Sequence, residues 1–91
     1  MQMRTDSNTV DLRGLDFPDA QSKTIDFISR RLTSKNGVVF ILHGHEGKKG
    51  MGLKTRIRDW LRKKGKAANV KKFEPAKKED GGDAYTRVEL T

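Results

Sequence analysis

The sequence predicts an α/β fold, a two-layer βαβαββ sandwich in which two helices pack on a four-stranded mixed sheet. Residues 38 to 42, Val-Val-Phe-Ile-Leu, form a continuous apolar run that is typical of a strand buried on both faces. Segments with apolar residues at helical spacing precede and follow this run. Two strand-like segments end the chain. With 91 residues the chain is long enough for one domain with one core.

The first strand is expected at residues 9 to 12, after a polar segment, residues 1 to 8, that we interpret as a disordered tail or linker. Strand alternation separates apolar from charged side chains: Val10 and Leu12 on one face, Asp11 and Arg13 on the other. Asp16 as a cap and Pro18 in the first turn begin a helix expected over residues 17 to 32. Helical spacing predicts its buried stripe: Ile25, Ile28 and Leu32, with Thr24 and either Ala20 or Gln21, and Phe27 at the edge.

The strand at residues 38 to 42 follows after a short connection, so the first two strands are expected to be parallel neighbours. The second helix is expected to begin at Leu53 and to end near Gly65, where a glycine is a usual C-terminal cap. One core is predicted from all elements: Leu12, Ile25, Ile28, Val39, Ile41, Leu53, Ile57, Trp60, Leu61 and Val88.

A third strand is expected from Val70 to Phe73 or Glu74, stopped by Pro75. Residues 76 to 83 form a long hairpin loop without an apolar anchor. The last strand, residues 85 to 90, then pairs antiparallel with the third.

The basic charge is confined to the middle of the chain. Residues 1 to 47 carry six Lys/Arg and six Asp/Glu, residues 48 to 78 carry thirteen and two, and residues 79 to 91 carry one and four. The middle block, net +11, accounts for the whole excess of +8. Such a block indicates a polyanionic partner, DNA or RNA. A merely solvated basic face is the alternative, and an anionic membrane surface is a weaker one because no large apolar face is left over.

Composition excludes several other classes of protein. The chain has no cysteine, so disulfide, zinc–thiolate and thiol chemistry are excluded, which fits an intracellular protein. It has no apolar run near the roughly 20 residues of a membrane span, and its first residues lack the apolar segment of a secretory signal. We expect no membrane partner and a monomer as an isolated domain.

A glycine-rich, basic loop joins the second strand to the second helix. After His43, residues 44 to 52 contain four glycines and two lysines, so the backbone there can approach a ligand closely. The unpaired N–H groups at the start of the helix are a natural phosphate site. The sequence therefore predicts an anion-binding loop.

Three segments in this order resemble the Smr (small MutS-related) domain: Val10-Asp11-Leu12-Arg13-Gly14-Leu15, then His43-Gly44, then Gly81-Gly82-Asp83 before the last strand. The resemblance covers residues 9 to 91. It implies a fold similar to the C-terminal domain of bacterial translation initiation factor three. It also implies a module linked to other domains, as in MutS-like and pentatricopeptide proteins, or a stand-alone protein. Nicking of DNA or cleavage of RNA is attributed to many members. We expect no required cofactor for this chain, although a divalent metal is compatible with such an activity.

Two departures from the family pattern concern the site. The first motif usually ends in histidine, whereas this chain has Arg13, a version found in the MutS-like branch. Arginine stays protonated and cannot carry a proton. In the second motif, residues 45 to 49 separate His43-Gly44 from Gly50-Met51-Gly52, an apparent insertion of about four residues relative to the family pattern.

The carboxyl ends of the first two strands should bring Arg13 and His43 together at one edge of the sheet, where ligands bind in such folds. We expect Arg13 to hold phosphate oxygens, His43 to transfer a proton and Asp11 to orient either of them. The expected nucleic-acid contacts come from the loop and the second helix: Gly44, Lys48, Lys49, Gly50, Gly52, Lys54, Arg58 and Arg62. The alternative for His43 is a strand-end histidine that is satisfied by backbone groups.

Other candidates are weaker. A metal site formed by His43, His45 and Glu46 is not favoured, because a glycine-rich loop does not hold alternate residues in a tetrahedral arrangement. Asp83 is interpreted as a turn residue. Tyr85 is either part of the core or a platform on which a base stacks.

The sequence thus predicts a nucleic-acid-binding Smr domain that acts as an endonuclease. Two alternatives from other classes stay open. One is a non-catalytic module that brings an attached domain to DNA or RNA. The other is a protein-interaction domain that uses the basic face on an acidic partner. DNA and RNA are not distinguished at this stage.

Overall fold

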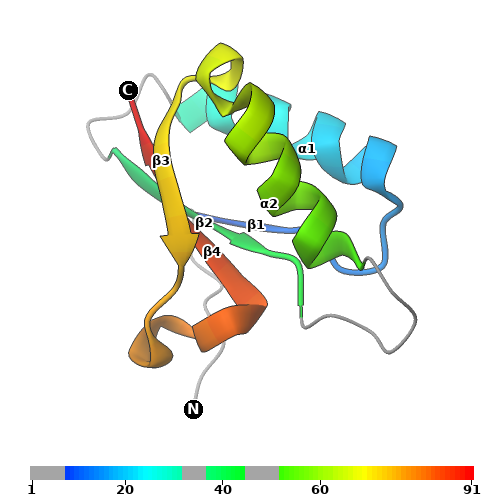
Figure 1. Ribbon diagram of the computed structural model, residues 1–91, viewed down its shortest axis with the longest axis vertical. Helices are drawn as coiled ribbons and strands as arrows, with labels where there is room; N and C mark the ends of the chain where they lie inside the picture. The colour runs from blue at the N-terminus through cyan, green and yellow to red at the C-terminus, as the bar shows by residue number, and fades with distance from the viewer. Residues whose placement is uncertain (1–7, 32–36, 45–51) are drawn as a thin grey trace.

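The computed structural model describes residues 8–31, 37–44 and 52–91 (Figure 1). Its helices and strands follow the predicted order: β1 (Thr9–Asp11), α1 (Phe17–Arg31), β2 (Val38–Leu42), α2 (Leu53–Lys64), β3 (Val70–Pro75) and β4 (Tyr85–Leu90). Short 3₁₀ turns extend the connections: η1 (Gly65–Ala68), η2 (Lys78–Asp80) and η3 (Gly82–Ala84). The expected tail at residues 1 to 8 lies outside the described residues, apart from Asn8.

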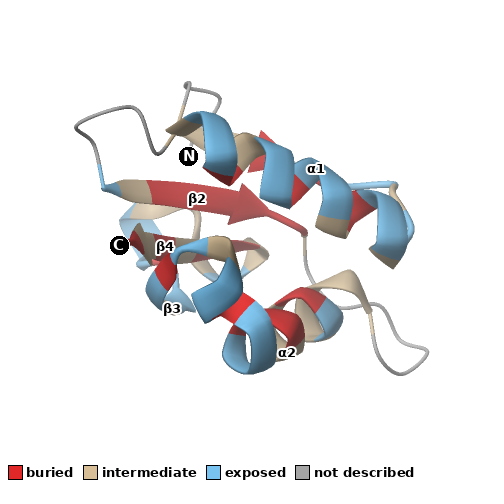
Figure 2. Cartoon of the chain, turned by 90° about the horizontal axis from the view of Figure 1, so that it is seen from above, coloured by how far each residue is buried: buried red, intermediate tan, exposed pale blue. Residues whose placement is uncertain are grey.

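The strands form one mixed sheet in the order β1-β2-β4-β3. β1 and β2 are parallel, and β4 lies antiparallel between β2 and β3. The parallel first pair and the antiparallel last pair confirm the predicted topology. Figure 2 shows β2 buried along most of its length, as expected for a central strand with an apolar sequence.

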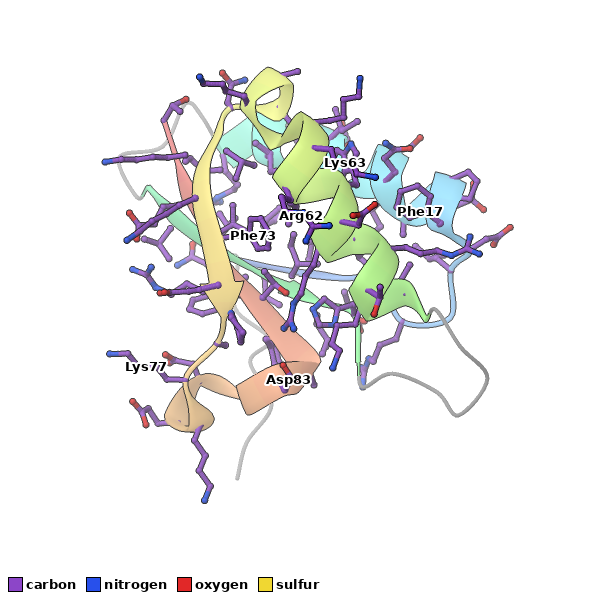
Figure 3. All side chains as sticks on the ribbon, viewed as in Figure 1. Phe17, Arg62, Lys63, Phe73, Lys77 and Asp83 are labelled. Carbon is purple, nitrogen blue, oxygen red and sulfur yellow. The ribbon has the colours of Figure 1, made fainter. Side chains whose placement is uncertain are left out.

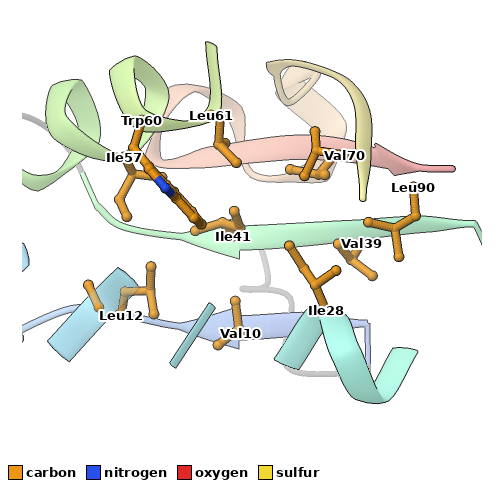
Figure 4. Packing of buried hydrophobic residues seen from close by; sticks show 12 residues of the cluster. Val10, Leu12, Ile28, Val39, Ile41, Ile57, Trp60, Leu61, Val70 and Leu90 are labelled. Carbon is orange, nitrogen blue, oxygen red and sulfur yellow. The ribbon is translucent and has the colours of Figure 1, made fainter. Parts of the chain in front are cut away.

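Both helices pack on the same face of the sheet. Val39 and Ile41, alternate residues of β2, belong to one buried cluster with Ile28 of α1 and Ile57 of α2 (Figure 4). Trp60, only 9% exposed, lies in the same cluster, as its helical spacing predicted. The domain is therefore a two-layer sandwich whose core lies between the helices and the sheet.

The opposite face of the sheet carries a second, smaller cluster. Phe40 and Leu42 alternate with the core residues of β2, so they point to this face, where they pack with Ala76 and Tyr85. Tyr85 is 2% exposed. Of the two interpretations of Tyr85, the structure thus supports a core residue and leaves no ring surface for stacking.

The buried stripe of α1 differs from the prediction. Ile25 is 47% exposed, and the buried residues are Ala20, Thr24 and Ile28. The helix can bury Thr24 because its hydroxyl donates to the carbonyl oxygen of Ala20 at 2.8 Å, so no polar group loses its hydrogen bond. This choice of phase turns Ile25 to solvent. Leu32, the last residue of the predicted stripe, lies outside the described residues.

The connection between β3 and β4 also differs in detail. Pro75 does not stop β3 but is its last residue, opposite Thr86, which an edge strand permits. The next residue, Ala76, is 7% exposed and anchors the loop in the second cluster. The predicted loop without an apolar anchor is therefore a short, anchored pair of 3₁₀ turns.

Candidate nucleic-acid interface

The carboxyl ends of β1 and β2 bring the first two motifs together. Asp11 pairs with Leu42 in the parallel register, so the residues that follow them leave the sheet at the same level. Gly44 has φ +84°, and a Cβ atom added there would lie 3.6 Å from Cγ of Arg13. The Arg13 side chain therefore lies against the Gly44 backbone. We call this region, from Arg13 to Gly44 with the start of α2, the strand-end edge.

Asp11 holds the guanidinium of Arg13 in place. Its Oδ1 accepts from Nε of Arg13 at 3.0 Å and from the Arg13 backbone N–H at 3.1 Å, and its Oδ2 accepts from Nη2 at 2.9 Å. These hydrogen bonds lower the pKa of Asp11 and raise that of Arg13. Both side chains are 49% exposed, so a fixed, charged guanidinium still faces solvent.

His43 is buried, and both of its ring nitrogens have partners. Nδ1 lies 2.8 Å from the carbonyl oxygen of Gly44, which can only accept, so Nδ1 carries the proton. Nε2 then accepts from the hydroxyl of Thr86 at 2.7 Å. Burial lowers the pKa of His43 to about 4; the Gly44 hydrogen bond opposes this shift, and the charges of Arg58 and Lys54 add to it. The imidazole is therefore neutral at pH 7, rather than poised near neutrality as its ordinary pKa suggested.

The Thr86 hydroxyl connects His43 to helix α2. Thr86 accepts from Nε of Arg58 at 2.8 Å, and the same guanidinium donates to a carboxylate oxygen of Asp83 at 3.1 Å and to the Tyr85 carbonyl at 3.2 Å. Lys54 donates to the other Asp83 oxygen. The hydrogen bond from Lys54 and then that from Arg58 lower the pKa of Asp83. This chain of hydrogen bonds ties the β3–β4 loop to α2 and fixes the tautomer of His43.

Two of these residues have roles that differ from the prediction or were missed by it. Asp83 does more than form a turn, because it pairs with two basic residues of α2. Thr86 was not singled out, although a signal exists: it is the polar member of an alternating series in β4, with Val88 and Leu90, that faces the core. A polar residue at such a position needs a buried partner.

The turn before Asp83 depends on glycine. Gly81 has φ +109°, and a Cβ atom added there would lie 2.3 Å from the ring of Tyr85. Gly82 also has a positive φ, +72°, but no neighbouring atom lies within 4 Å of a Cβ atom added at this position. The turn at Gly81 precedes Asp83, which pairs with Lys54 and Arg58 in the N-terminal half of α2.

The predicted nucleic-acid contacts differ in exposure and in their partners, and Gly44 of this set lies against Arg13. Lys54 and Arg58 are engaged by Asp83, and their side chains are only 18% and 19% exposed. Arg62 is open to solvent, with 68% exposure, and pairs with Asp59 one helical turn earlier. Gly52 is the N-cap residue of α2, which therefore has no side-chain cap. The remaining predicted contacts, and the loop residues of the disfavoured metal site, lie outside the described residues: Lys48, Lys49, Gly50, His45 and Glu46.

Exposed basic side chains lie along α2, η1 and β3 and in the loop after β3, and Figure 3 labels Arg62, Lys63 and Lys77 among them. Those for which the described residues supply no ion-pair partner are Arg56, Lys64, Lys66, Lys71, Lys77 and Lys78. We call the part of this surface formed by α2, η1 and β3 the basic face. It is the structural counterpart of the +11 block of the sequence.

Within residues 8–31, 37–44 and 52–91, no group of three His, Asp or Glu side chains is arranged to hold a metal ion. In the same part of the chain, no helix has the length and apolar character needed to cross a membrane.

Comparison with known proteins identifies the family. The family model of the Smr domain matches residues 10–91. Among solved structures, the Smr domain of Thermus thermophilus MutS2 is 30% identical, with a TM-score of 0.75 over 92% of this chain and 98% of that one. YdaL, a stand-alone small MutS-related protein from Escherichia coli, has a TM-score of 0.78 at 18% identity, over 94% of this chain and 66% of that one. A search of curated proteins gave no match. The chain belongs to the Smr domain family.

Proposed function

We propose that this Smr domain binds nucleic acid at the strand-end edge and along the basic face, and that it cleaves a phosphodiester bond at that edge. The observation that supports the proposal best is the position of Arg13, which Asp11 fixes against Gly44 where two parallel strands end. A guanidinium that is already oriented loses little conformational freedom when it binds a phosphate.

The surroundings of Arg13 also favour an anion. Helix α2 begins at this edge with no acidic residue in its first turn, so its N-terminal N–H groups add positive potential. Lys54 and Arg58 hold Asp83 and therefore support the site rather than bind phosphate directly. Phosphate contacts on this part of the surface fall to Arg13, the backbone at Gly44 and the exposed cations of α2.

In this proposal His43 accepts a proton at Nε2. At pH 7 the ring is neutral, and Nε2 is the nitrogen with a lone pair. For this step the Thr86 side chain must turn away about its Cα–Cβ bond, so that its hydroxyl no longer fills the position 2.7 Å from Nε2 and an attacking hydroxyl group or water can take its place. A phosphate bound beside Arg13 brings negative charge that raises the pKa of the ring, which makes it a better base when substrate is present. Arg13 then stabilises the charge that develops on phosphate oxygens.

The second candidate function is nucleic-acid binding without cleavage. One specific observation favours it: His43 is buried, and each ring nitrogen already has a hydrogen-bond partner. In this alternative, His43 and Thr86 keep Gly44 and Arg13 in position for binding. The domain then delivers an attached domain to DNA or RNA.

Incubation with supercoiled plasmid and with structured RNA, with and without EDTA, separates the two candidates. Wild type, His43→Ala and Arg13→Ala proteins are purified identically, and melting curves establish that each is folded. If the domain is a nuclease, His43→Ala reduces cleavage by roughly 10²-fold or more with little change in affinity, whereas Arg13→Ala weakens both. Binding without cleavage on every substrate supports the second candidate. Equal cleavage by wild type and His43→Ala excludes His43 as the proton acceptor.

A further inference from the structure

A second feature of the basic face lies apart from the strand-end edge. A groove of about 350 Å³ runs between the C-terminal half of α2 with η1 and the edge strand β3. Leu61, Val70 and Phe73 form its apolar wall, and the cations come from Arg62, Lys66, Lys71 and Lys72. Figure 3 shows Phe73 between β3 and α2, on the side of Arg62.

A β-bulge in β3 builds this groove. The pairing with β4 shifts between Val70 and Lys72, so one extra residue, Lys71, is inserted into the strand. Without the bulge, Val70 and Phe73, three residues apart, would point to opposite faces. With it, Val70 pairs with Leu90 and Phe73 with Val88, so both side chains face the helices. The same insertion directs Lys71, which is exposed, to the edge of the groove.

The charge of the groove is of one sign. Among the described residues, no acidic side chain lines it, and neither Lys66 nor Lys71 has an acidic partner. Arg62 pairs with Asp59 of α2 and Lys72 with Glu89 of β4, and these two cations still keep 68% and 60% exposure. An occupant of the groove must therefore be anionic at its edge and apolar where it meets Phe73.

We propose that this groove binds a single-stranded segment of nucleic acid, with a base against Phe73 and the neighbouring phosphates on Lys66 and Lys71. The inference rests on the proposed function and names the form of substrate that the basic face selects. An unpaired base offers an apolar ring face beside two charged phosphates, which matches the groove. A duplex keeps its bases stacked inside and presents phosphates alone, so it leaves the Phe73 ring unused.

The test compares affinities for a fluorescent single-stranded 12-mer and for a hairpin duplex that contains the same sequence. The groove variants are Lys66→Ala/Lys71→Ala and Phe73→Leu. Leucine keeps apolar contact with the core, so Phe73→Leu can be measured even if Phe73→Ala does not fold. Lys77→Ala/Lys78→Ala is the matched control, because it removes the same charge from exposed positions outside the groove. A polyglutamate competitor tests whether an acidic protein segment occupies the groove instead.

The proposal predicts that both groove variants lose about tenfold in affinity for the single strand and much less for the hairpin. The double lysine variant should also lose about 1.4 from its single-strand salt slope, at roughly 0.7 per phosphate. The control should weaken both probes to a similar extent. If groove and control variants lose affinity to the same extent for both probes, the groove assignment is wrong while nucleic-acid binding stands. The same holds if polyglutamate displaces the single strand from wild type but not from Phe73→Leu. If wild type binds neither probe, the proposed function itself fails.

Discussion

The buried, neutral state of His43 makes the stability of the domain depend on pH. His43 has an ordinary pKa of 6.5 in the unfolded chain and a pKa of about 4 in the folded domain. Between these values the unfolded chain binds a proton that the folded domain does not bind. The stability that the neutral ring contributes is therefore fully present above pH 6.5 and is lost progressively as the pH falls from there to about 4.

The size of the effect follows from that difference. At about 1.4 kcal/mol per pH unit, a change from 6.5 to about 4 corresponds to about 3.5 kcal/mol in the free energy of unfolding. Most of it, about 2.5 kcal/mol, should already be lost at about pH 4.5. A domain of this size has a total stability of about 5–15 kcal/mol. The pKa values of Asp11 and Asp83 are also lowered, and these carboxylates lose their contribution at lower pH than the histidine does.

Urea unfolding of wild type and of His43→Gln, at several values between about pH 7.5 and about pH 4.5, measures this contribution. The other histidine, His45, is present in both proteins, so the difference between their pH dependences isolates His43. Wild type should lose about 2.5 kcal/mol more than the variant over this range. The same pH dependence in both proteins would refute a buried, neutral His43.

Three further predictions test the core, the β3–β4 turn and the network of hydrogen bonds. Trp60→Ala should lower the free energy of unfolding by about 3–5 kcal/mol, measured by urea unfolding, because the ring is 9% exposed within the core; native tryptophan fluorescence typical of full exposure to water would contradict this. Gly81→Ala should lower the melting temperature more than Gly82→Ala, since only at Gly81 does the added Cβ meet a ring, 2.3 Å away; equal shifts would contradict this geometry of the turn. Arg58→Glu should destabilise the fold, whereas Arg62→Glu, at a 68% exposed position, should leave the melting temperature nearly unchanged while it weakens nucleic-acid binding; a stable Arg58→Glu protein would show that the network is dispensable.

The order of elements and the meeting of the first two motifs could be predicted from the sequence. Apolar runs and helical spacing depend on local composition, and parallel pairing of the first strands follows from the short crossover between them. Arg13 and Gly44 were therefore expected at one edge, and they lie there. The antiparallel pairing of β4 with β3 was predicted as well.

Features that depend on packing between distant segments could not be predicted in this way. Which face of α1 is buried depends on whether Thr24 can be buried. That in turn depends on a hydrogen bond to Ala20, which hydrophobic spacing does not reveal. Because β4 lies between β2 and β3 in the sheet, Thr86 of β4 lies within hydrogen-bonding distance of His43. From the sequence, His43 was a strand-end residue with an ordinary pKa, and its burial became evident only with this neighbour in place.

In the proposed function, Arg13 at the strand-end edge binds a phosphate of nucleic acid. The most direct measurement is the affinity for a DNA duplex as a function of salt concentration, for wild type, Arg13→Ala and Arg30→Ala. Arg30 is a matched control, since it is an exposed arginine that pairs with Asp26 near the C-terminal end of α1. Arg13→Ala should bind more weakly and with a salt slope smaller by about 0.9, the value of one phosphate, while Arg30→Ala should resemble wild type. Equal affinities and slopes for the two variants would contradict this role of Arg13.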